Sequence, residues 1–571
     1  MKNWKFPLAL LLLLPALWLA CTKNDVTPDG PNVTVTFAGQ VLDENNQPLA
    51  GADVHVGIAS AVTDANGVFR LQPVQQPARN AILSVHRQDY FDFSRAYVVG
   101  NNALQTVRIQ LLKKQLVHSF MTAQSTTAQV GAVQIRFPAN SVGLAGGGEY
   151  SGIVSVYARY LDPSDPDLRL RMPGDLRGIS TGGAEQTLAT FGMIGVELST
   201  PGGTPLQIAA GKEVEITLPI PAGKSAVAPA EIPLWHYDVE SARWIEEGTA
   251  QKVGNQYVGK VKHFSFWNCD VGLPLIHLGG HIFIDNPQNP AQLATVKLTV
   301  LSQGWEGYGP TYSNGYFGGL VPANEIMKME VQQLDQCGQW ITLSTQTIGP
   351  FSTDATLPDE IVTLPNIPST VISGRLVDCN QQPVTNGYVA LGLAPYFWQT
   401  IFTDNSGEFK HTVLLCNSNP IELTGYDLNG LATSGPLSFS ITGSALQLGD
   451  IAVCTTPDEY FEITVDGKKY TFIAGFEGLT DGSRTSIYGW TPDQSTVYAG
   501  FQNNGQTGTF PLLYFQLYPG FDTLSAINMS TQLTQFGTKG QPFSGTINGT
   551  IKTQTGQTKT VSGKYKILRD N

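Results

Sequence analysis

The eight histidines are the residues best able to bind a metal or move a proton, and their spacing predicts no catalytic zinc site. Such a site needs three converging His, Glu or Cys ligands, and no His-Glu-x-x-His, His-x-x-Glu or Cys-x-x-Cys motif occurs. His277 and His281 are four residues apart, but Leu-Gly-Gly between them favours a strand over a helix. His236 and His263 adjoin aromatic residues and are interpreted as packed or hydrogen-bonded strand residues. We therefore expect no metal ion and no cofactor.

Other reaction types find no better support in the sequence. The alternation of strands and helices that presents a serine nucleophile elbow is absent, and no pair of carboxylates is placed across a cleft as a glycosidase requires. Asp162, Asp165 and Asp167 form an acidic loop that lacks the Gly and the distal Glu of a calcium-binding EF-hand. The loop is interpreted as solvated, and we predict that the protein has no catalytic residues and is not an enzyme.

The first twenty residues have the pattern of an export signal. Lys2 and Lys5 precede a 15-residue apolar run, residues 6–20, which is too short to span a membrane comfortably. The run ends directly before Cys21 and resembles the lipobox of bacterial lipoproteins, although Trp18 stands where that motif usually has Leu. The resemblance implies that Cys21 carries a lipid and becomes the mature N-terminus, which would make the lipid the membrane partner.

Residues 21–32 form a polar tether without core-forming side chains. Lys23-Asn24-Asp25 loosely resembles the short acidic signals that send Bacteroidetes lipoproteins to the cell surface. The resemblance implies a lipid-anchored protein of the outer membrane, exposed at the cell surface. Whether it faces outward or into the periplasm stays open.

Five cysteines remain after Cys21, an odd number for an oxidising compartment. Three of them, Cys379, Cys416 and Cys454, lie in one stretch of about 85 residues. One disulfide among these three is predicted, and the sequence leaves open which two of them pair.

Composition predicts an all-β protein with many turns and few helices. Charged residues make up only 14% of the chain, Gly occurs 60 times, and alternating apolar stretches are separated by turn residues. The net charge of −12 argues against nucleic acid or anionic lipid as a partner, because such binding requires basic patches.

The elements that would position any site are organised by a pattern that occurs twice. Each copy contains a Gly, a Pro nine residues later, and then the turn Thr-Asp-x-x-Gly-x-Phe. Asp and Gly favour a tight hairpin, because the Asp side chain bonds turn amides and Gly adopts positive φ. The residues are Gly39, Pro48, Gly51, Thr63, Asp64, Gly67 and Phe69, then Gly374, Pro383, Gly387, Thr403, Asp404, Gly407 and Phe409.

Both copies resemble the carboxypeptidase regulatory-like domain, a small transthyretin-like β-sandwich without catalytic residues. A degenerate third copy is assigned to residues 275–365, with His281 to Pro287 as its first strand and turn and Ser313 to Phe317 as its hairpin. The region between, 113–272, resembles a β-rich extracellular domain that often follows a regulatory-like module and serves in adhesion or scaffolding.

The predicted fold is a tandem array of β-sandwich modules of the immunoglobulin or transthyretin type. We call them module one (33–112), module two (113–272), module three (275–365) and module four (369–454). The C-terminal domain (455–571) is predicted to be an antiparallel sandwich or barrel whose last strand seals an edge.

The C-terminal domain is dense in aromatic residues, and it is the candidate binding region for a glycan or a surface protein. Tyr488, Trp490 and Tyr498 are the candidate contacts, because they flank a turn-like segment, residues 491–494. Tyr514 and Phe515 must face opposite sides of a strand, so one of them is predicted to be core and the other exposed. The fallback region is module two, around its tryptophans Trp235, Trp244 and Trp267.

We therefore expect a non-catalytic surface lipoprotein that binds a ligand or acts as a scaffold. Two alternatives stay open: an accessory component of a glycan- or peptide-uptake system, and a hydrolase of unrecognised type with its site at a junction between modules. A deep pocket with clustered titratable residues would favour the hydrolase, and a flat aromatic strip would favour binding.

Overall fold

The computed structural model describes residues 29–570, apart from 166, 303, 365–366, 394–396, 430–431, 442, 457–458, 473–475, 491–495, 519–523 and 554–556. Within this part of the chain the structure is almost entirely strands, with one short α-helix, α1 (Leu168–Arg171), and one 3₁₀ turn, Ala222–Lys224. No helix among these residues is long and apolar enough to cross a membrane. The prediction of an all-β chain of tandem sandwiches is confirmed.

Module one is a sandwich of two four-stranded sheets around a core of Val, Leu and Phe side chains. Its first strand pairs with the last strand in parallel and with two others in antiparallel register. One sheet contains β1 (Asn32–Leu42), β4 (Val68–Arg70), β5 (Val74–Pro77) and β8 (Ala103–Gln110). The other contains β2 (Asp53–Val56), β3 (Ala59–Val62), β6 (Ala81–His86) and β7 (Phe93–Tyr97).

Module four repeats this topology, again with the first strand parallel to the last. Its sheets are β29 (Ser369–Val377) with β32 (Glu408–Leu414) and β35 (Ala445–Ala452), and β30 (Gly387–Leu393) with β31 (Phe397–Phe402), β33 (Ile421–Asp427) and β34 (Thr433–Phe439).

Module three has the same plan. The end of β21 (Phe266–Ile284) pairs with β24 (Tyr316–Pro322) in antiparallel register and with β27 (Ala355–Thr356) and β28 (Glu360–Val362) in parallel. The facing sheet contains β22 (Thr295–Val300), β23 (Trp305–Pro310), β25 (Met327–Leu334) and β26 (Trp340–Ile348).

One detail of the third copy differs from the prediction. The turn after the first strand uses Pro290, not Pro287, because the isolated bridge Phe283↔Pro290 occupies the place held by the bridges of Pro48 and Pro383 in the other copies. The third copy has one residue more between its Gly and its Pro. The expected hairpin is present, since Gly315 has a φ of 79°.

A buried threonine explains part of the repeated pattern. The Thr63 hydroxyl accepts a hydrogen bond from the Ala52 N–H (2.8 Å) and donates one to the Leu49 carbonyl (2.7 Å). It thereby joins the proline turn to the start of the second strand inside the core, where unpaired backbone groups are costly. The same bonds connect Thr403 with Gly387 and Val384, and Thr311 with Ala294 and Ala291.

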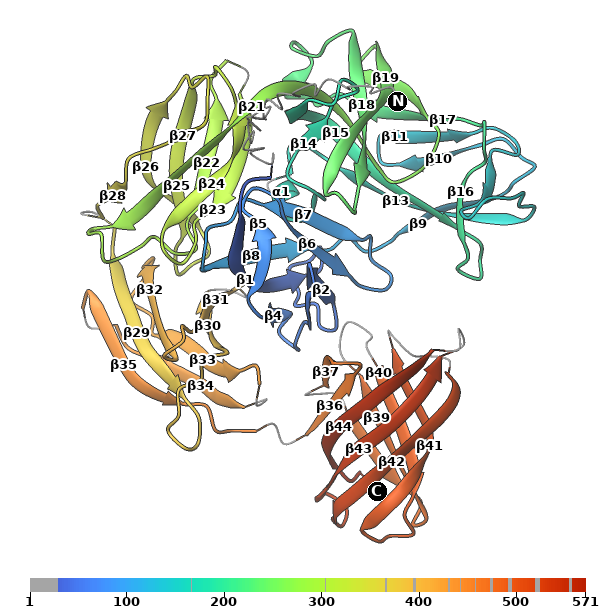
Figure 1. Ribbon diagram of the computed structural model, residues 1–571, viewed down its shortest axis with the longest axis vertical. Coiled ribbons are helices and arrows are strands. Elements are labelled where there is room, and N and C mark those ends of the chain that lie inside the picture. Colours follow the sequence, from blue (N-terminus) through green and yellow to red (C-terminus); the bar gives the residue numbers. More distant parts are fainter. Residues whose placement is uncertain are drawn as a thin grey trace, which may run out of the picture.

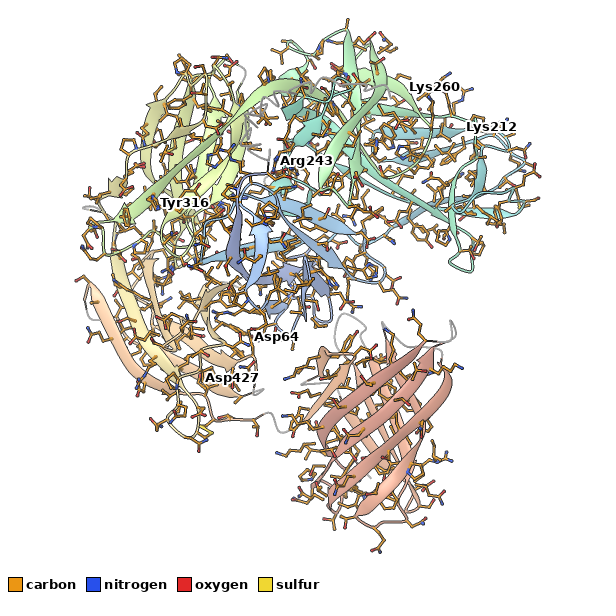
Figure 2. The ribbon with its side chains drawn as sticks, viewed as in Figure 1. Asp64, Lys212, Arg243, Lys260, Tyr316 and Asp427 are labelled. Atoms are coloured by element: carbon orange, nitrogen blue, oxygen red, sulfur yellow. A yellow bond between two sulfur atoms is a disulfide. The ribbon has the colours of Figure 1, made fainter. Side chains whose placement is uncertain are left out.

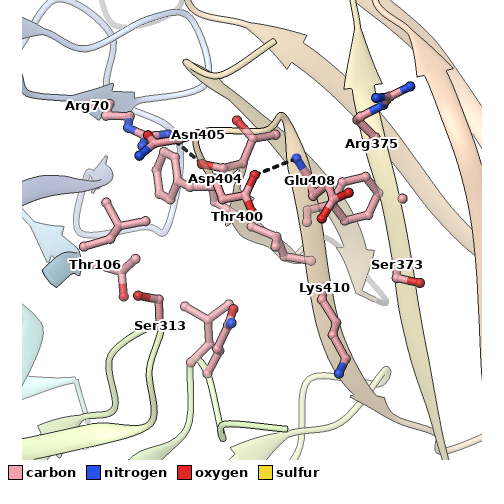
Figure 3. A pocket seen from close by; sticks show the side chains of 18 of the residues that line it. Arg70, Thr106, Ser313, Ser373, Arg375, Thr400, Asp404, Asn405, Glu408 and Lys410 are labelled. Atoms are coloured by element: carbon pink, nitrogen blue, oxygen red, sulfur yellow. Dashed lines mark hydrogen bonds between the residues drawn. The ribbon is translucent and has the colours of Figure 1, made fainter. Parts of the chain in front are cut away.

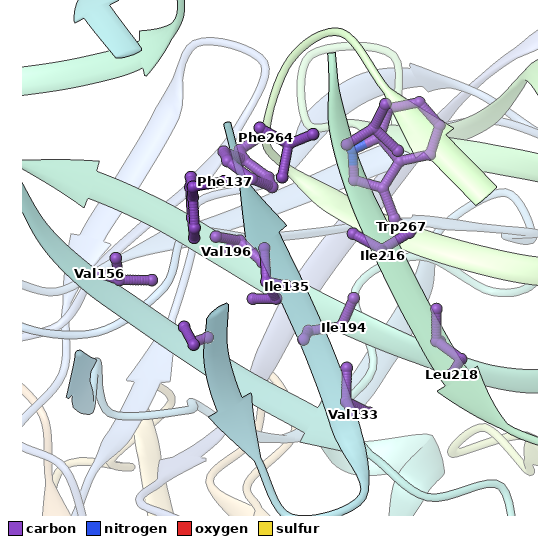
Figure 4. Close-up of a cluster of buried hydrophobic side chains, with 14 of the residues drawn as sticks. Val133, Ile135, Phe137, Val156, Ile194, Val196, Ile216, Leu218, Phe264 and Trp267 are labelled. Atoms are coloured by element: carbon purple, nitrogen blue, oxygen red, sulfur yellow. The ribbon is translucent and has the colours of Figure 1, made fainter. Parts of the chain in front are cut away.

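Module two is the largest unit, and its strands form one extensive sheet that folds around a main core, with a second core shared with module one. Figure 4 shows this core, where Phe137, Phe264 and Trp267 lie among branched aliphatic side chains. The strands are β9 (Leu116–Met121), β10 (Thr126–Val130), β11 (Val133–Phe137), β12 (Val142–Leu144), β13 (Ile153–Leu161), β14 (Arg177–Ile179), β15 (Glu185–Ser199), β16 (Pro205–Ile208), β17 (Val214–Pro219), β18 (Glu231–Asp238), β19 (Arg243–Val253), β20 (Gln256–Val261) and the beginning of β21.

The boundary between modules two and three lies inside a strand. We placed it between residues 272 and 275, but β21 runs without interruption from Phe266 to Ile284. Its first part pairs with β15 and β18 of module two, and its second part pairs with β24 of module three. Hydrogen-bonding partners on both sides of the expected boundary keep the backbone extended, so no linker separates the two modules.

Module one lies at the centre of the first four modules (Figure 1). Phe91 of module one packs edge-on against Phe266 of module two, with ring centroids 5.4 Å apart. Arg79 forms an ion pair of 2.6 Å with Asp354 of module three. Figure 2 shows Asp64 of module one where it faces module four, and it accepts a 2.8 Å hydrogen bond from the Tyr388 hydroxyl.

The C-terminal domain is one nine-stranded antiparallel sheet that curves around its own core. The last strand does not seal an edge as predicted, because β44 lies between β36 and β43. The strands are β36 (Tyr460–Val465), β37 (Lys468–Phe472), β38 (Phe476–Thr480), β39 (Arg484–Trp490), β40 (Thr496–Gln502), β41 (Gly508–Tyr518), β42 (Leu524–Phe536), β43 (Pro542–Thr553) and β44 (Thr558–Leu568).

Candidate functional site

Two of the three predicted aromatic contacts lie side by side on the outer face of the C-terminal domain. Tyr488 on β39 is the direct cross-strand partner of Tyr498 on β40. Their rings meet edge to face with centroids 6.0 Å apart. Their exposed fractions are 38% and 37%, which is high for a tyrosine in the middle of a sheet.

A third ring, which the sequence analysis did not assign to the site, extends this pair. Tyr514 on β41 stacks on Tyr498 with centroids 4.6 Å apart. Its hydroxyl lies 2.8 Å from the Ser486 hydroxyl on β39, so the side chain crosses β40. The crossing is possible because Gly500 has no side chain, and a Cβ there would overlap the Tyr514 ring. We call Tyr488, Tyr498 and Tyr514 the tyrosine ladder.

The alternation of side chains along the strands separates the tyrosine ladder from the core. Phe515, the neighbour of Tyr514, is 1% exposed and belongs to the core as predicted, whereas Tyr514 is half-buried and not exposed. Leu479 on β38 lies opposite Ser486 and is 41% exposed, so it adds apolar surface beside the ladder. The outer face of β38 to β41 is therefore an aromatic and apolar platform with hydroxyl groups among the rings.

The surroundings of Tyr498 in the ladder raise the pKa of its phenol above the ordinary value. Its side-chain hydrogen bond with Tyr514 is the main cause that raises its pKa, and partial burial adds to the effect. A neutral phenol both donates and accepts hydrogen bonds, so the ladder offers polar and apolar contacts together.

Two predicted sites fall outside the described side chains. Cys21 lies outside the described residues, so the lipid attachment stays a prediction. The backbone of Trp490 belongs to β39, where it pairs with Thr496, but its side chain is outside the described part, as is the turn at 491–495.

One disulfide joins two of the three cysteines of module four, as predicted, and a second disulfide joins the remaining one to module three. Cys379 pairs with Cys454 inside the module, and Cys416 pairs with Cys337 of module three. The prediction left open whether Cys416 pairs within module four and did not include Cys337, because a pairing between modules depends on how they pack. Cys269 is a buried free thiol in module two.

A groove of about 830 Å³ lies where modules one, three and four meet (Figure 3). Arg70 enters from module one and donates to the Thr403 carbonyl (2.9 Å) and the Thr385 carbonyl (3.2 Å). At one side Arg375 forms a two-pronged ion pair with Asp450, at 2.9 and 2.7 Å.

The charged groups of this groove already have structural partners. The Asp404 carboxylate accepts hydrogen bonds from the backbone N–H groups of Ser406 (2.8 Å) and Glu408 (2.9 Å) and so stabilises its own turn. Burial is the main cause that lowers the pKa of Arg70. Among the described residues that line the groove, no serine, threonine or lysine is hydrogen-bonded to a histidine or a carboxylate.

Two local sequence features resemble functional sites: a Gly-x-Ser-x-Gly match and the acidic loop. In the structure the first lies in a hairpin turn and the second contains an ion pair. Gly178-Ile-Ser-Thr-Gly182 has the spacing of a nucleophile elbow, a match that the sequence analysis overlooked. Ser180, however, lies in the hairpin between β14 and β15, with its hydroxyl 3.1 Å from the Ala184 carbonyl. In the acidic loop, Asp165 is ion-paired with Arg171 at 2.5 Å.

The histidines lie in strands and turns, and two of them meet. His277 and His281 lie in β21, as the Gly-Gly between them indicated. His236 packs beside aromatic residues in β18, as interpreted, whereas His263 lies at a bend before β21 and is hydrogen-bonded to Glu247 at 3.1 Å. Both imidazoles face this one carboxylate, because His236 Nε2 is 3.6 Å from Glu247 Oε2. Burial is the main cause that lowers the pKa of His236, followed by the adjacent His263.

The prediction of a fallback binding region around the tryptophans of module two is wrong. Trp235, Trp244 and Trp267 are all at most 1% exposed. Trp235 and Trp244 fill the core shared by modules one and two, and Trp267 fills the core of module two, so none of them can contact an external ligand.

No known protein-family profile matches this chain. Human cartilage intermediate layer protein 2 is 27% identical to it over 157 residues, which is 26% of this chain and 13% of the human protein. The mouse protein of the same name is 32% identical over 111 residues, which is 19% of this chain and 9% of the mouse protein. The chain therefore matches only a small part of these relatives.

Among solved structures, the shaft pilin SpaA of Lactobacillus rhamnosus GG aligns with 32% of this chain and 98% of its own, at 10% identity and a TM-score of 0.17. The minor pilin GBS52 of Streptococcus agalactiae also aligns with 32% of this chain and 98% of its own, at 11% identity and a TM-score of 0.14.

Proposed function

We propose that this protein is a non-catalytic surface lipoprotein that binds polysaccharide through the tyrosine ladder. The observation that carries the proposal is the row Tyr488–Tyr498–Tyr514 on the outer face of the sheet, in which Tyr488 and Tyr498 are exposed and Tyr514 is half-buried. Aromatic rings stack against the apolar faces of sugars, and the hydroxyls among them can bond sugar hydroxyls. Gln516, the exposed cross-strand partner of Tyr498, adds an amide on the same face.

Modules one to four serve as the frame in this proposal. The Cys337–Cys416 disulfide, the uninterrupted strand β21 and the Arg79–Asp354 ion pair connect neighbouring modules. Cys21 would carry the lipid that anchors this frame to the outer membrane. Cys21→Ser should then move the protein from the membrane fraction to the soluble fraction, and unchanged fractionation would contradict the anchoring.

The binding proposal is tested by affinity electrophoresis in gels that contain xylan, mannan, pectin or mixed-linkage β-glucan. Delayed migration of the full chain in at least one gel, lost on deletion of residues 455–571, supports it. If the deletion variant is delayed as much as the full chain, the site lies elsewhere. If no gel delays the full chain, polysaccharide is not the ligand. An accessory role in glycan uptake requires the same binding, followed by transfer to a transporter.

A further inference from the structure

Two imidazole nitrogens and one carboxylate oxygen converge on the surface of module two. They belong to His236, His263 and Glu247, and one ligand atom from each lies within 4.8 Å of the others. We propose that these three side chains form a binding site for a divalent transition metal such as Zn²⁺. The site is separate from the tyrosine ladder and does not depend on polysaccharide binding.

The distances between the ligand atoms fit a tetrahedral metal. Zn–N and Zn–O bonds of about 2.0–2.1 Å place neighbouring ligand atoms about 3.3 Å apart. Glu247 Oε2 lies 3.1 Å from His263 Nε2 and 3.6 Å from His236 Nε2. The two distances bracket the tetrahedral value, and the ligand nitrogens of the two histidines lie within 4.8 Å of each other.

The sheet of module two determines which way these ligands point. His236 on β18 lies opposite Ile245 on β19, and Glu247 follows Ile245 by two residues, so His236 and Glu247 share one face. His236 also lies opposite Trp267 on β21, directly beyond the segment that carries His263.

Trp267 packs against the imidazole rings of His236 and His263 on the side that faces the core. Its indole N–H donates to the His263 carbonyl at 2.9 Å. Its ring centroid is 5.1 Å from that of His263 and 5.6 Å from that of His236. Because Trp267 is only 1% exposed, it forms a fixed wall that limits how far both histidines can move.

The opposite side of the cluster is open to solvent. The side chains of His236, His263 and Glu247 are 20%, 33% and 37% exposed. A bound ion would therefore have three protein ligands and at least one position for water or an external ligand. Two nitrogens and one oxygen suit Zn²⁺ and Cu²⁺ better than the hard ions Mg²⁺ and Ca²⁺, which prefer oxygen ligands.

The test is titration of the metal-free, purified full chain with ZnCl₂ by isothermal calorimetry, with MgCl₂ for comparison. We expect one Zn²⁺ per chain in the micromolar range or tighter, and no comparable binding of Mg²⁺. His236→Gln and His263→Gln should each weaken Zn²⁺ binding at least tenfold. His86→Gln is the matched control. His86 forms a 2.6 Å ion pair with Asp92, and this pair is part of no group of three possible metal ligands among the described residues.

A spectroscopic measurement on the unsubstituted chain keeps the proposal testable if a variant does not fold. One equivalent of Cu²⁺ should give an electron paramagnetic resonance spectrum with hyperfine splitting from two imidazole nitrogens. Absence of stoichiometric Zn²⁺ binding would overturn the proposal. So would Zn²⁺ binding that survives both histidine substitutions, or a Cu²⁺ spectrum without nitrogen coupling, and the cluster would then be a hydrogen-bond network only.

Discussion

Replacement of Thr63 by Val tests the structural explanation of the repeated pattern. The two side chains have nearly the same shape, so the change removes the hydroxyl without leaving a cavity. Thr63 is 2% exposed, and its hydroxyl is bonded to the Ala52 N–H and the Leu49 carbonyl. Both backbone groups would stay buried without this partner.

The expected loss in the free energy of unfolding of module one follows from these two backbone groups. Each unsatisfied buried backbone group costs about 1–3 kcal/mol, and the new buried methyl returns about 0.8 kcal/mol. Thr63→Val should therefore destabilise module one by about 1–5 kcal/mol. In a chain of several modules a single unfolding midpoint is poorly defined, so hydrogen exchange with mass spectrometry is the suitable assay.

Peptides that cover residues 49–63 should exchange at least fivefold faster in Thr63→Val than in the unsubstituted chain, because exchange of protected amides reports local opening. Peptides from the C-terminal domain should not change. Thr106→Val on β8 is the matched control, because its side chain is half-exposed and its hydroxyl can bond to water. Equal exchange in the two variants would refute the role assigned to the buried hydroxyl.

Three further predictions concern the ladder, the disulfides and pH. Gly500→Ala should displace the Tyr514 ring and lower polysaccharide affinity without unfolding the C-terminal domain, as checked by affinity electrophoresis and circular dichroism. Cys337→Ser opens a bridge between residues 79 apart in sequence, a loss of about 4–5 kcal/mol from loop-closure entropy; proteolysis of modules three and four should accelerate, and an unchanged rate would contradict the bridge. Burial raises the pKa of Asp270 to about 8. The folded state thus retains a proton that the unfolded state releases above about pH 4, so module two should lose stability as pH rises from about 4 to 8. Asp270→Asn should flatten that pH dependence in hydrogen exchange of module-two peptides, compared with the unsubstituted chain at each pH; an equally steep dependence in the two chains would contradict the role assigned to Asp270.

Sequence alone could predict the repeated modules because their determinants are local. Gly67 and Gly407 both have positive φ, at 69° and 75°, as their hairpin turns require. The same reasoning misplaced the third proline, because Pro290 comes one residue later than the pattern expects. It also placed a boundary within β21, where no local signal shows that the strand continues into the next sheet.

The site residues were predictable only in part because they depend on pairing between strands. Tyr488 and Tyr498 come from adjacent strands of one hairpin, so their proximity follows from nearby sequence. Tyr514 joins them only because β41 pairs with β40 and Gly500 leaves room for its ring. Cys337 and Cys416 likewise meet only through the packing of two modules, which no spacing in the sequence reports.

The central claim is that the tyrosine ladder binds polysaccharide, and the most direct test compares Tyr498→Ala with Tyr308→Ala. Tyr498 contacts both other rings of the ladder, whereas Tyr308 lies in module three with a similar exposed fraction of 42%. The measurement is the dissociation constant from affinity electrophoresis in whichever polysaccharide delays the full chain. Tyr498→Ala should weaken binding about tenfold, or about 1.4 kcal/mol, and Tyr308→Ala should leave it unchanged. Equal affinity of the two variants would contradict the claim.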